Sequence, residues 1–259
     1  NIFCVAIFNE ADSNSPYVHE ANQSVRIKDT YLDAKEIVEL ALKTNVQAIH
    51  PGYGFLSENS KFAKLVEKSG LIWIGPTPKA IEIMGDKIKS KKYAAKAKVP
   101  VLEIIEHEKD VKKIGFPILV KAAAGGGGKG MRLVQDPKEL KDSIKMAKLE
   151  AYNSFDDDRV FFEKYVEKSR HIEVQVLADN HGSILHLGER ECSIQRRYQK
   201  IIEECPSPRI DDATRDKITS AAVNLAKQIN YQSAGTVEFL MDDMTGEFWF
   251  LEMNTRLQV

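Results

Sequence analysis

The last two apolar segments of the chain carry carboxylates that could bind a metal ion. Residues 236–241 and 248–254 are two short, largely apolar runs, which predicts two antiparallel strands that turn near Thr245. This register places Glu238 opposite Glu252 on one face, with Cβ atoms ~5 Å apart, where like charges repel each other. A cation should therefore bridge them, and Asn254 completes an all-oxygen set suited to Mg²⁺ that carries substrate phosphates. A solvated polar face is the alternative.

The second of these strands is predicted to continue to the last residue, Val259. Alternation then places four polar side chains along one face: Glu252, Asn254, Arg256 and Gln258. The opposite face is apolar and suited to a core: Leu251, Met253 and Leu257. An arginine in the middle of a polar strand face is a candidate for binding an anion.

A run of glycines is the second chemical feature. Residues 125–130 formally satisfy G-x-G-x-x-G, but the dinucleotide motif requires a helix next, and residues 131–134 indicate a strand. A P-loop would need Ser or Thr at position 130, which is Gly. The remaining hypothesis is a glycine hairpin whose backbone N–H groups close over phosphates, with a flexible turn as the alternative. Lys121, at the end of the strand before it, is either a point charge for a phosphate or a solvated surface lysine.

Residues 191–200 are rich in Arg, Lys and Gln and could order around an anion. Cys192, within this segment, has no neighbouring histidine, so a buried structural thiol is favoured over a nucleophile. His171 alternates with Glu173 and Gln175 on the polar face of a predicted strand. It is a candidate for the site, although a surface histidine fits the pattern almost as well.

The elements that position these residues fall into two groups. Strands at 2–8, 46–49 and 71–75 alternate with helices at 33–42 and 59–68, which predicts a parallel α/β unit. After a break at 75–78, strands at 116–122, 131–134, 160–166, 171–177 and 183–189 follow one another, with helices at 136–152 and 214–229. This order predicts an antiparallel α+β unit. The loop at 50–54 follows a strand end, where parallel sheets usually bind ligands.

Composition excludes several classes of protein. The 259 residues carry 37 basic and 38 acidic side chains, so a nucleic-acid partner is not expected. Apolar runs stay below the ~18–20 residues of a membrane helix. Three cysteines (Cys4, Cys192 and Cys205) argue against a disulfide scaffold and for a reducing compartment. The first and last residues of the sequence both lie within predicted strands, so a partial chain is expected.

Four segments carry a resemblance to a known family. Residues 116–121 with the glycine run look like the lid of the ATP-grasp fold, and residues 250–257 look like its metal-binding strand. Residues 49–59 and 192–200 are similar to biotin carboxylase, and this resemblance covers essentially the whole chain. It implies a Rossmann-like pre-ATP-grasp domain at 1–76 without its first strand. An ATP-grasp domain at 77–259 would follow, ending early, with a lid subdomain at about 101–165.

The resemblance also implies roles for individual residues. ATP phosphates would be held by Lys87, Lys121 and the backbone of Gly126, Gly127 and Gly128. Glu163 would accept from the adenine amino group, beside the backbone of Lys164 to Val166, while His171 and Gln195 line the ribose. Glu238, Glu252 and Asn254 would hold Mg²⁺ or Mn²⁺. Bicarbonate would bind Lys200, Arg256, Gln258 and the backbone of Val259, with Lys200 and Arg256 acting in catalysis. Tyr198 stands where many members have His, which implies an altered contact in the ATP pocket.

The implied activity is ATP-dependent carboxylation of biotin. ATP phosphorylates bicarbonate, and the resulting carboxyphosphate yields CO2 that the ureido nitrogen of biotin captures. The implied partners are a biotin carboxyl carrier protein or domain, a carboxyltransferase component and a second copy in a homodimer. The implied location is the cytoplasm, or the mitochondrial matrix in a eukaryote. In the family a glutamate base follows the position of Val259, so this chain alone is expected to be inactive. Another bicarbonate-activating ATP-grasp ligase, or a nucleotide-binding fragment without turnover, remains an alternative.

Overall fold

The computed structural model describes residues 2–125 and 128–258. Its first part contains short parallel strands and helices, in this order: β1 (Val5–Phe8), η1 (Glu10–Asp12), α1 (Pro16–Glu20), β2 (Gln23–Arg26), α2 (Ala34–Lys43), β3 (Ala48–Ile49), α3 (Ser60–Lys68) and β4 (Ile72–Trp73). Strand β1 pairs with β2 and β3 with β4, both in parallel. The predicted α/β character is confirmed, whereas β2 and α1 were not predicted. Helices α2 and α3 bury Ile37, Phe62 and Val66 against Trp73.

Two consecutive helices connect this part to the sheets that follow. Helix α4 (Pro78–Met84) begins after Thr77, whose side chain accepts from the N–H of Ala80. Helix α5 (Lys87–Lys96) begins after Asp86, whose carboxylate accepts from the N–H groups of Ile88 and Lys89. Such side-chain caps satisfy backbone donors that have no partner within the helix. The cap at Asp86 fixes the position of Lys87 at the start of α5.

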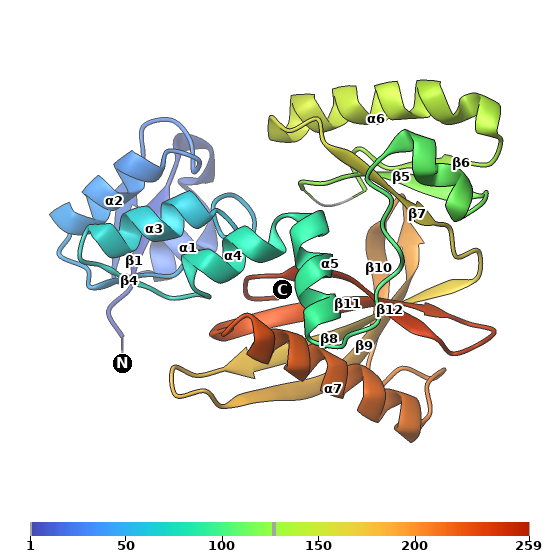
Figure 1. Ribbon diagram of the computed structural model, residues 1–259. Coiled ribbons are helices and arrows are strands. Elements are labelled where there is room, and N and C mark those ends of the chain that lie inside the picture. The colour runs from blue at the N-terminus through green and yellow to red at the C-terminus, as the bar shows by residue number, and fades with distance from the viewer. Residues whose placement is uncertain (1, 126–127, 259) are drawn as a thin grey trace.

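A three-stranded antiparallel sheet forms the next layer. It contains β5 (Ile118–Ala122), β6 (Arg132–Val134) and β7 (Val160–Lys164) in the order β6-β5-β7, with η2 (Glu108–Lys113) before it and η3 (Pro137–Glu139) and α6 (Leu140–Phe155) between β6 and β7. Figure 1 shows α6 lying along one face of this sheet. The glycine run connects β5 to β6, as the predicted strand after it requires. The segment expected to be a helix from residue 136 starts as η3 and becomes α-helical at Leu140.

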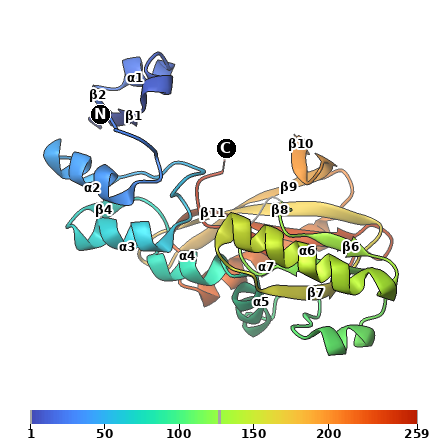
Figure 2. The same cartoon turned by 90° about the horizontal axis from the view of Figure 1, so that it is seen from above.

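The largest sheet is antiparallel and has five strands. These are β8 (Ser169–Ala178), β9 (Ile184–Arg196), β10 (Gln199–Glu204), β11 (Ser233–Asp242) and β12 (Phe248–Asn254), in the order β10-β9-β8-β11-β12. Helix α7 (Asp212–Gln228) packs against β8 and β9 (Figure 1). Its Ile218, Ala222 and Leu225 join Ile172, Val174 and other strand residues in the main core. Figure 2 shows the three-stranded sheet and α6 stacked over this sheet.

The predicted final hairpin forms, but two details of its second strand differ from the prediction. Strand β12 ends at Asn254 and does not continue through Arg256 to the end of the described chain. A bulge beside Glu238 inserts Leu251 between the partners of Glu238 and Phe239, so Leu251 faces a cavity and not the core. Leu257, expected in the core, is 46% exposed because it lies beyond the strand. Met253 is buried as predicted.

Residues 191–200 form regular structure. They are the end of β9, a turn and the start of β10, and Arg197 and Tyr198 at the turn both have positive φ. The boundary expected between residues 76 and 77, and the lid subdomain at about 101–165, stay predictions. Among the described residues, no helix combines the length and the apolar character needed to cross a membrane.

Candidate functional site

Two adjoining cavities lie between the three-stranded and five-stranded sheets. The first has a volume of about 260 Å³ and apolar walls that include Leu102, Leu119, Leu240 and Phe250. The second has a volume of about 410 Å³ and is lined mainly by charged and amide side chains. Both are bordered by the same central residues: Lys121, Met131, His171, Gln195, Tyr198 and Leu251. The arrangement is a cleft with an apolar end and a charged end.

Three buried charges stand at the wall of the apolar cavity. Glu163, on β7, accepts from Lys121 Nζ at 3.0 Å through one carboxylate oxygen, and its other oxygen lies 2.7 Å from Lys91 Nζ. Lys91, on α5, also donates to the carbonyl of Phe250 on β12 at 3.0 Å. Burial opposes ionisation of Glu163, but the two lysines outweigh it and lower the pKa of this carboxyl. Burial dominates for Lys91 and lowers the pKa of its ammonium group.

Sequence reasoning placed Lys121 and Glu163 at the site but did not identify Lys91. Alone, Lys91 reads as one lysine in the lysine-rich stretch of residues 87–92. Its partner Glu163 is remote in sequence, so no local pattern indicates the pair. Both Glu163 oxygens face lysines in the structure, and the role of Glu163 toward adenine stays a prediction. Lys164 and Val166 line the same cavity, and Lys164 Nζ donates to the carbonyl of Phe116 at 3.0 Å.

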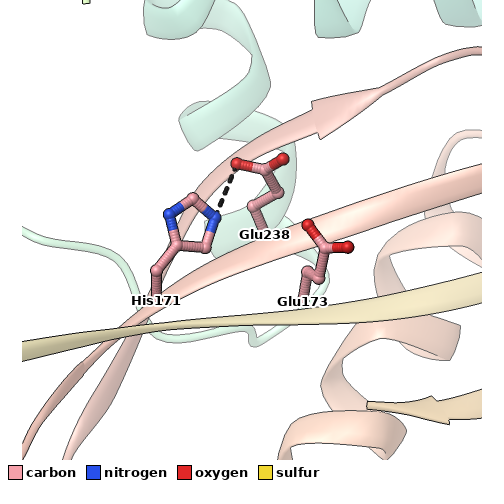
Figure 3. Close-up of side chains that lie close together, drawn as sticks. All are labelled: His171, Glu173 and Glu238. Atoms are coloured by element: carbon pink, nitrogen blue, oxygen red, sulfur yellow. Dashed lines mark ion pairs between the residues drawn. The ribbon is translucent and has the colours of Figure 1, made fainter. Parts of the chain in front are cut away.

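The predicted pairing of Glu238 with Glu252 is confirmed by the register of β11 and β12. Glu238 is buried and has three neighbours at hydrogen-bonding distance: His171 Nε2 at 2.8 Å, Lys200 Nζ at 2.7 Å and Asn254 Nδ2 at 2.6 Å. Figure 3 shows His171 and Glu238 pointing toward each other, with Glu173 beside them. Burial opposes ionisation of Glu238, but His171 and Lys200 outweigh it and lower its pKa to about 2.

Lys200 is held between two buried carboxylates. Its ammonium group contacts Glu238 and also Glu173, which in turn contacts the guanidinium of Arg190. Burial alone would lower the pKa of Lys200, but the charges of Glu238 and Glu173 outweigh it and raise this pKa. His171, Glu173 and Glu238 form a group whose atoms could hold a cation, and Lys200 supplies one. Arg190 was not identified from sequence, because its partner lies on the neighbouring strand.

Glu252 faces the charged cavity and contacts a different lysine. Lys87 Nζ lies 3.3 Å from its carboxylate and also donates to the carbonyl of Gly125. Lys87 therefore connects the start of α5, the glycine loop and strand β12. The predicted phosphate-binding lysines and predicted metal carboxylates line one cavity, which contains Lys87, Lys121, Glu238, Glu252 and Asn254.

Arg256 and Gln258 reach the charged cavity although the strand has ended. Arg256 donates to Gln258 Oε1 at 2.9 Å, to the carbonyl of Leu257 at 3.1 Å and to Asn254 Oδ1 at 3.2 Å. Strand alternation was expected to direct Arg256 and Gln258 to the same face as Glu252 and Asn254. In the structure these hydrogen bonds hold the Arg256 side chain beside Asn254 and Gln258 at the cavity. Lys200 lines the same cavity, so three of the four residues expected at the bicarbonate site come together. Val259, the fourth, lies outside the described residues.

The turn between β9 and β10 borders the glycine loop. Gln195 Nε2 lies 2.9 Å from His171 Nδ1 and donates to the carbonyl of Cys192 at 2.7 Å. The backbone of Gly128 lies so close to the Tyr198 ring that a Cβ there would be 2.4 Å from Cδ2. Gly126 and Gly127 lie outside the described residues. Cys192 is fully buried, and burial raises the pKa of its thiol to about 12, which agrees with a structural role.

Comparisons with known proteins agree with this geometry. The biotin carboxylase N-terminal domain matches residues 1–81, and the carbamoyl-phosphate synthase L chain ATP-binding domain matches residues 84–259. The propionyl-CoA carboxylase alpha chain of Ruegeria pomeroyi is 50% identical, and the alignment covers 100% of this chain and 40% of that protein. Biotin carboxylase of Nostoc sp. is 47% identical over 100% of this chain and 60% of that protein.

Solved structures give the same result. Biotin carboxylase of Campylobacter jejuni, in a β-γ-ATP complex, superposes with a TM-score of 0.95 at 42% identity and covers 98% of this chain and 60% of that one. The biotin carboxylase domain dimer of Hydrogenobacter thermophilus 2-oxoglutarate carboxylase, with MgADP, ADP and bicarbonate, also gives 0.95, at 45% identity over 98% and 59%.

The two sheets around a charged and apolar cleft form an ATP-binding domain of the ATP-grasp class. The chain belongs to the biotin carboxylase family and contains its N-terminal and ATP-binding domains. It spans 40% of the Ruegeria relative and 60% of the Nostoc relative.

Proposed function

We propose that this chain supplies the ATP site and much of the bicarbonate site of an enzyme that carboxylates biotin. One observation carries the proposal: a single cavity contains lysines suited to phosphates, oxygen ligands suited to a metal and an arginine suited to bicarbonate. The adjoining apolar cavity has the size and lining of a slot for a flat base. The relatives named for biotin carboxylase, and the neighbours solved with ATP-type nucleotides and bicarbonate, support the same assignment.

In this proposal adenine enters the apolar cavity and the phosphates point into the charged one. Leu119, Leu240 and Phe250 would enclose the base, with the Lys164–Val166 backbone and Glu163 at its polar edge. Lys121 lies at the junction of the two cavities, where an ammonium group can neutralise phosphate charge. Lys87 and the backbone of the glycine loop, including Gly126 to Gly128, would hold the terminal phosphates.

The donor set fits a divalent cation. Glu238, Glu252 and Asn254 offer carboxylate and amide oxygens, the ligands that Mg²⁺ and Mn²⁺ prefer. In the structure the two carboxylates each face an ammonium group, Lys200 for Glu238 and Lys87 for Glu252, so positive charge is already favoured there. The ion would neutralise phosphate charge during transfer. His171 and Asn254 keep Glu238 in place.

The remaining residues would bind and orient bicarbonate. Arg256 and Gln258 offer N–H donors, and Lys200 lines the same cavity beside Glu238. A bicarbonate oxygen would attack the terminal phosphorus of ATP, giving ADP and carboxyphosphate. Breakdown of carboxyphosphate gives CO2 and a phosphate ion, which would take the proton of the ureido nitrogen of biotin. This nitrogen would then form the new N–C bond with CO2. Lys200 and Arg256 would stabilise the negative charge that develops during these steps.

The proposal includes partners and location. Biotin would be presented on a carrier protein or domain, and a carboxyltransferase component would use the carboxylated biotin, in keeping with relatives named as carboxylase alpha chains. A homodimer is proposed because the Hydrogenobacter neighbour is a dimer. The enzyme would act in the cytoplasm, or in mitochondria if it resembles the methylcrotonoyl-CoA carboxylase alpha subunit of Oryza sativa, which is 48% identical and is named as mitochondrial.

A second reading, a carbamoyl-phosphate-type ligase, is favoured only by the family match of residues 84–259. Both reactions activate bicarbonate, so the carboxyl acceptor separates them. The experiment uses a longer protein that contains this sequence and has the full length of its relatives. This protein is incubated with ATP, Mg²⁺, radiolabelled bicarbonate and either biotin or ammonia. The proposal expects label in biotin. Label only in carbamoyl phosphate would support the second reading.

A further inference from the structure

Glu58 connects the N-terminal part of the chain to the residue expected to bind bicarbonate. Its carboxylate accepts from the backbone N–H of Thr255 at 2.8 Å and lies 3.3 Å from Thr255 Oγ1. The other carboxylate oxygen accepts from Arg256 Nε at 3.3 Å. These contacts join residues almost 200 positions apart. Glu58 lies within the 49–59 segment, to which the proposed function gives no role.

The backbone around Glu58 is well anchored. Leu56 and Ser57, which precede it, are buried, and Ser57 donates its N–H to the carbonyl of Gly54 at 2.9 Å. Asn59, which follows it, caps helix α3 by accepting from the N–H groups of Lys61 and Phe62. Glu58 therefore extends from a fixed point between a buried turn and a helix cap.

The residues that Glu58 contacts, Thr255 and Arg256, lie just beyond the end of strand β12. Strand β12 ends at Asn254, so the N–H of Thr255 has no acceptor in the strand ladder. Glu58 provides that acceptor and at the same time engages the Nε edge of Arg256. The Nη atoms of Arg256 are directed to Asn254, Leu257 and Gln258. Because a guanidinium is planar, fixing Nε on one side sets the direction of the whole group.

We propose that Glu58 is a positioning residue that holds Arg256 in the orientation needed to bind bicarbonate. The inference rests on the proposed role of Arg256. The Glu58 side chain is 42% exposed, and exposed ion pairs contribute little to folding stability. Loss of Glu58 should therefore affect the use of bicarbonate more than the stability of the protein. The segment at 49–59 thereby contributes to a site that is built mainly by the ATP-binding domain.

The test compares three variants: Glu58→Ala, Glu58→Gln and Arg256→Ala. Each is made in a longer protein that contains this sequence and has the full length of its relatives. Glu58→Ala is expected to raise the KM for bicarbonate about tenfold, because misplacing a binding group is costly even when the group is retained. Glu58→Gln keeps an oxygen that can accept from Thr255 and should give a smaller increase. The Kd for MgADP should stay near wild type in both. The thermal midpoint should stay near wild type in Glu58→Gln and fall modestly in Glu58→Ala, which leaves the buried N–H of Thr255 without its acceptor. Glu67→Ala, an exposed glutamate on α3, is the matched control and should change none of these values.

The double variant Glu58→Ala/Arg256→Ala separates positioning from independent binding. If Glu58 acts through Arg256, the double variant should have the same bicarbonate KM as Arg256→Ala alone. An unchanged KM in Arg256→Ala would refute the proposed role of Arg256 itself. A raised KM in Arg256→Ala with an unchanged KM in Glu58→Ala would overturn only the positioning inference. Additive effects in the double variant would also overturn the positioning inference. So would a Glu58→Ala variant whose MgADP affinity and thermal stability fall as strongly as its use of bicarbonate.

Discussion

Lys91 Nζ lies 2.7 Å from a Glu163 carboxylate oxygen, and both side chains are almost fully buried, at 1% and 2% exposure. The second oxygen of Glu163 contacts Lys121, which borders both cavities of the cleft. Glu163 is thus shared between a lysine that is enclosed in the protein and one that faces the proposed phosphates. Lys91 also contacts the Phe250 carbonyl, so the pair joins α5, β7 and β12.

Replacing Lys91 should destabilise the protein. In Lys91→Met the Glu163 carboxylate loses one of its two cations in a buried site, and we expect a loss of about 3 kcal/mol in the free energy of unfolding. Urea unfolding measures this loss. Lys92→Met is the matched control, because the Lys92 side chain is 57% exposed and its pairing with Glu106 should contribute little. Equal stability of Lys91→Met and Lys92→Met would contradict the assigned importance of the buried pair.

Glu252→Gln should weaken nucleotide binding only when a divalent cation is present. The change removes an anionic oxygen ligand and leaves the size of the side chain almost unchanged. We expect the Kd for MgADP to rise at least tenfold, or about 1.4 kcal/mol, with little change for ADP in EDTA. Calorimetric titrations give both values. Glu247→Gln, at an exposed position before β12, is the control. The metal assignment is wrong if Glu252→Gln binds MgADP as wild type does.

Gly128→Ala should impair nucleotide binding through the glycine loop. Gly128 has φ +75°, and a Cβ there would overlap the Tyr198 ring. The loop would have to move away from the β9–β10 turn, and we expect the Kd for MgATP to rise about tenfold. Gly182→Ala is a suitable control, because Gly182 has φ +93° but open space around it. If both variants bind MgATP alike, the contact between Gly128 and Tyr198 has no role in nucleotide binding.

Cys192 should be unreactive in the folded protein. Burial raises the pKa of its thiol to about 12, whereas Cys4 and Cys205 are exposed. A thiol-reactive dye at pH 8 should label two cysteines quickly and the third only after unfolding. Because the folded pKa lies above the ordinary value of 9.0, the neutral thiol stabilises the fold fully below that pH. This contribution should be lost as the pH rises from about 9 toward 12, and Cys192→Ser should show a weaker dependence. Rapid labelling of three cysteines would contradict the buried assignment.

The parts of the site that depend on short-range regularity could be predicted from the sequence. Two apolar runs on either side of a turn near Thr245 predicted the hairpin and the pairing of Glu238 with Glu252, which the register confirms. The strand predicted after the glycine run excluded a dinucleotide motif, Gly130 excluded a P-loop, and the structure has β6 after the run. Helical spacing located α3 and α7 to within a few residues.

The remaining parts depend on contacts between distant segments or on local irregularity. The bulge that turns Leu251 toward a cavity interrupts a regular alternation, and the sequence around Leu251 contains no glycine or proline to indicate it. Glu58 and Thr255 meet only through the tertiary fold, as do Lys91 and Glu163. Each of these side chains has an ordinary local pattern, so its role becomes visible only when its partner is placed beside it.

The central claim is that this cleft brings ATP and bicarbonate together so that the terminal phosphoryl group passes to a bicarbonate oxygen. Its most direct test is incubation of the full-length protein with MgATP, biotin and bicarbonate labelled with heavy oxygen, followed by mass analysis of the phosphate released. Attack by bicarbonate predicts one labelled oxygen in each phosphate, together with ATP-dependent formation of carboxybiotin, and Arg256→Ala should slow both. Phosphate that contains no labelled oxygen, released at the normal rate while biotin is carboxylated, would contradict the account.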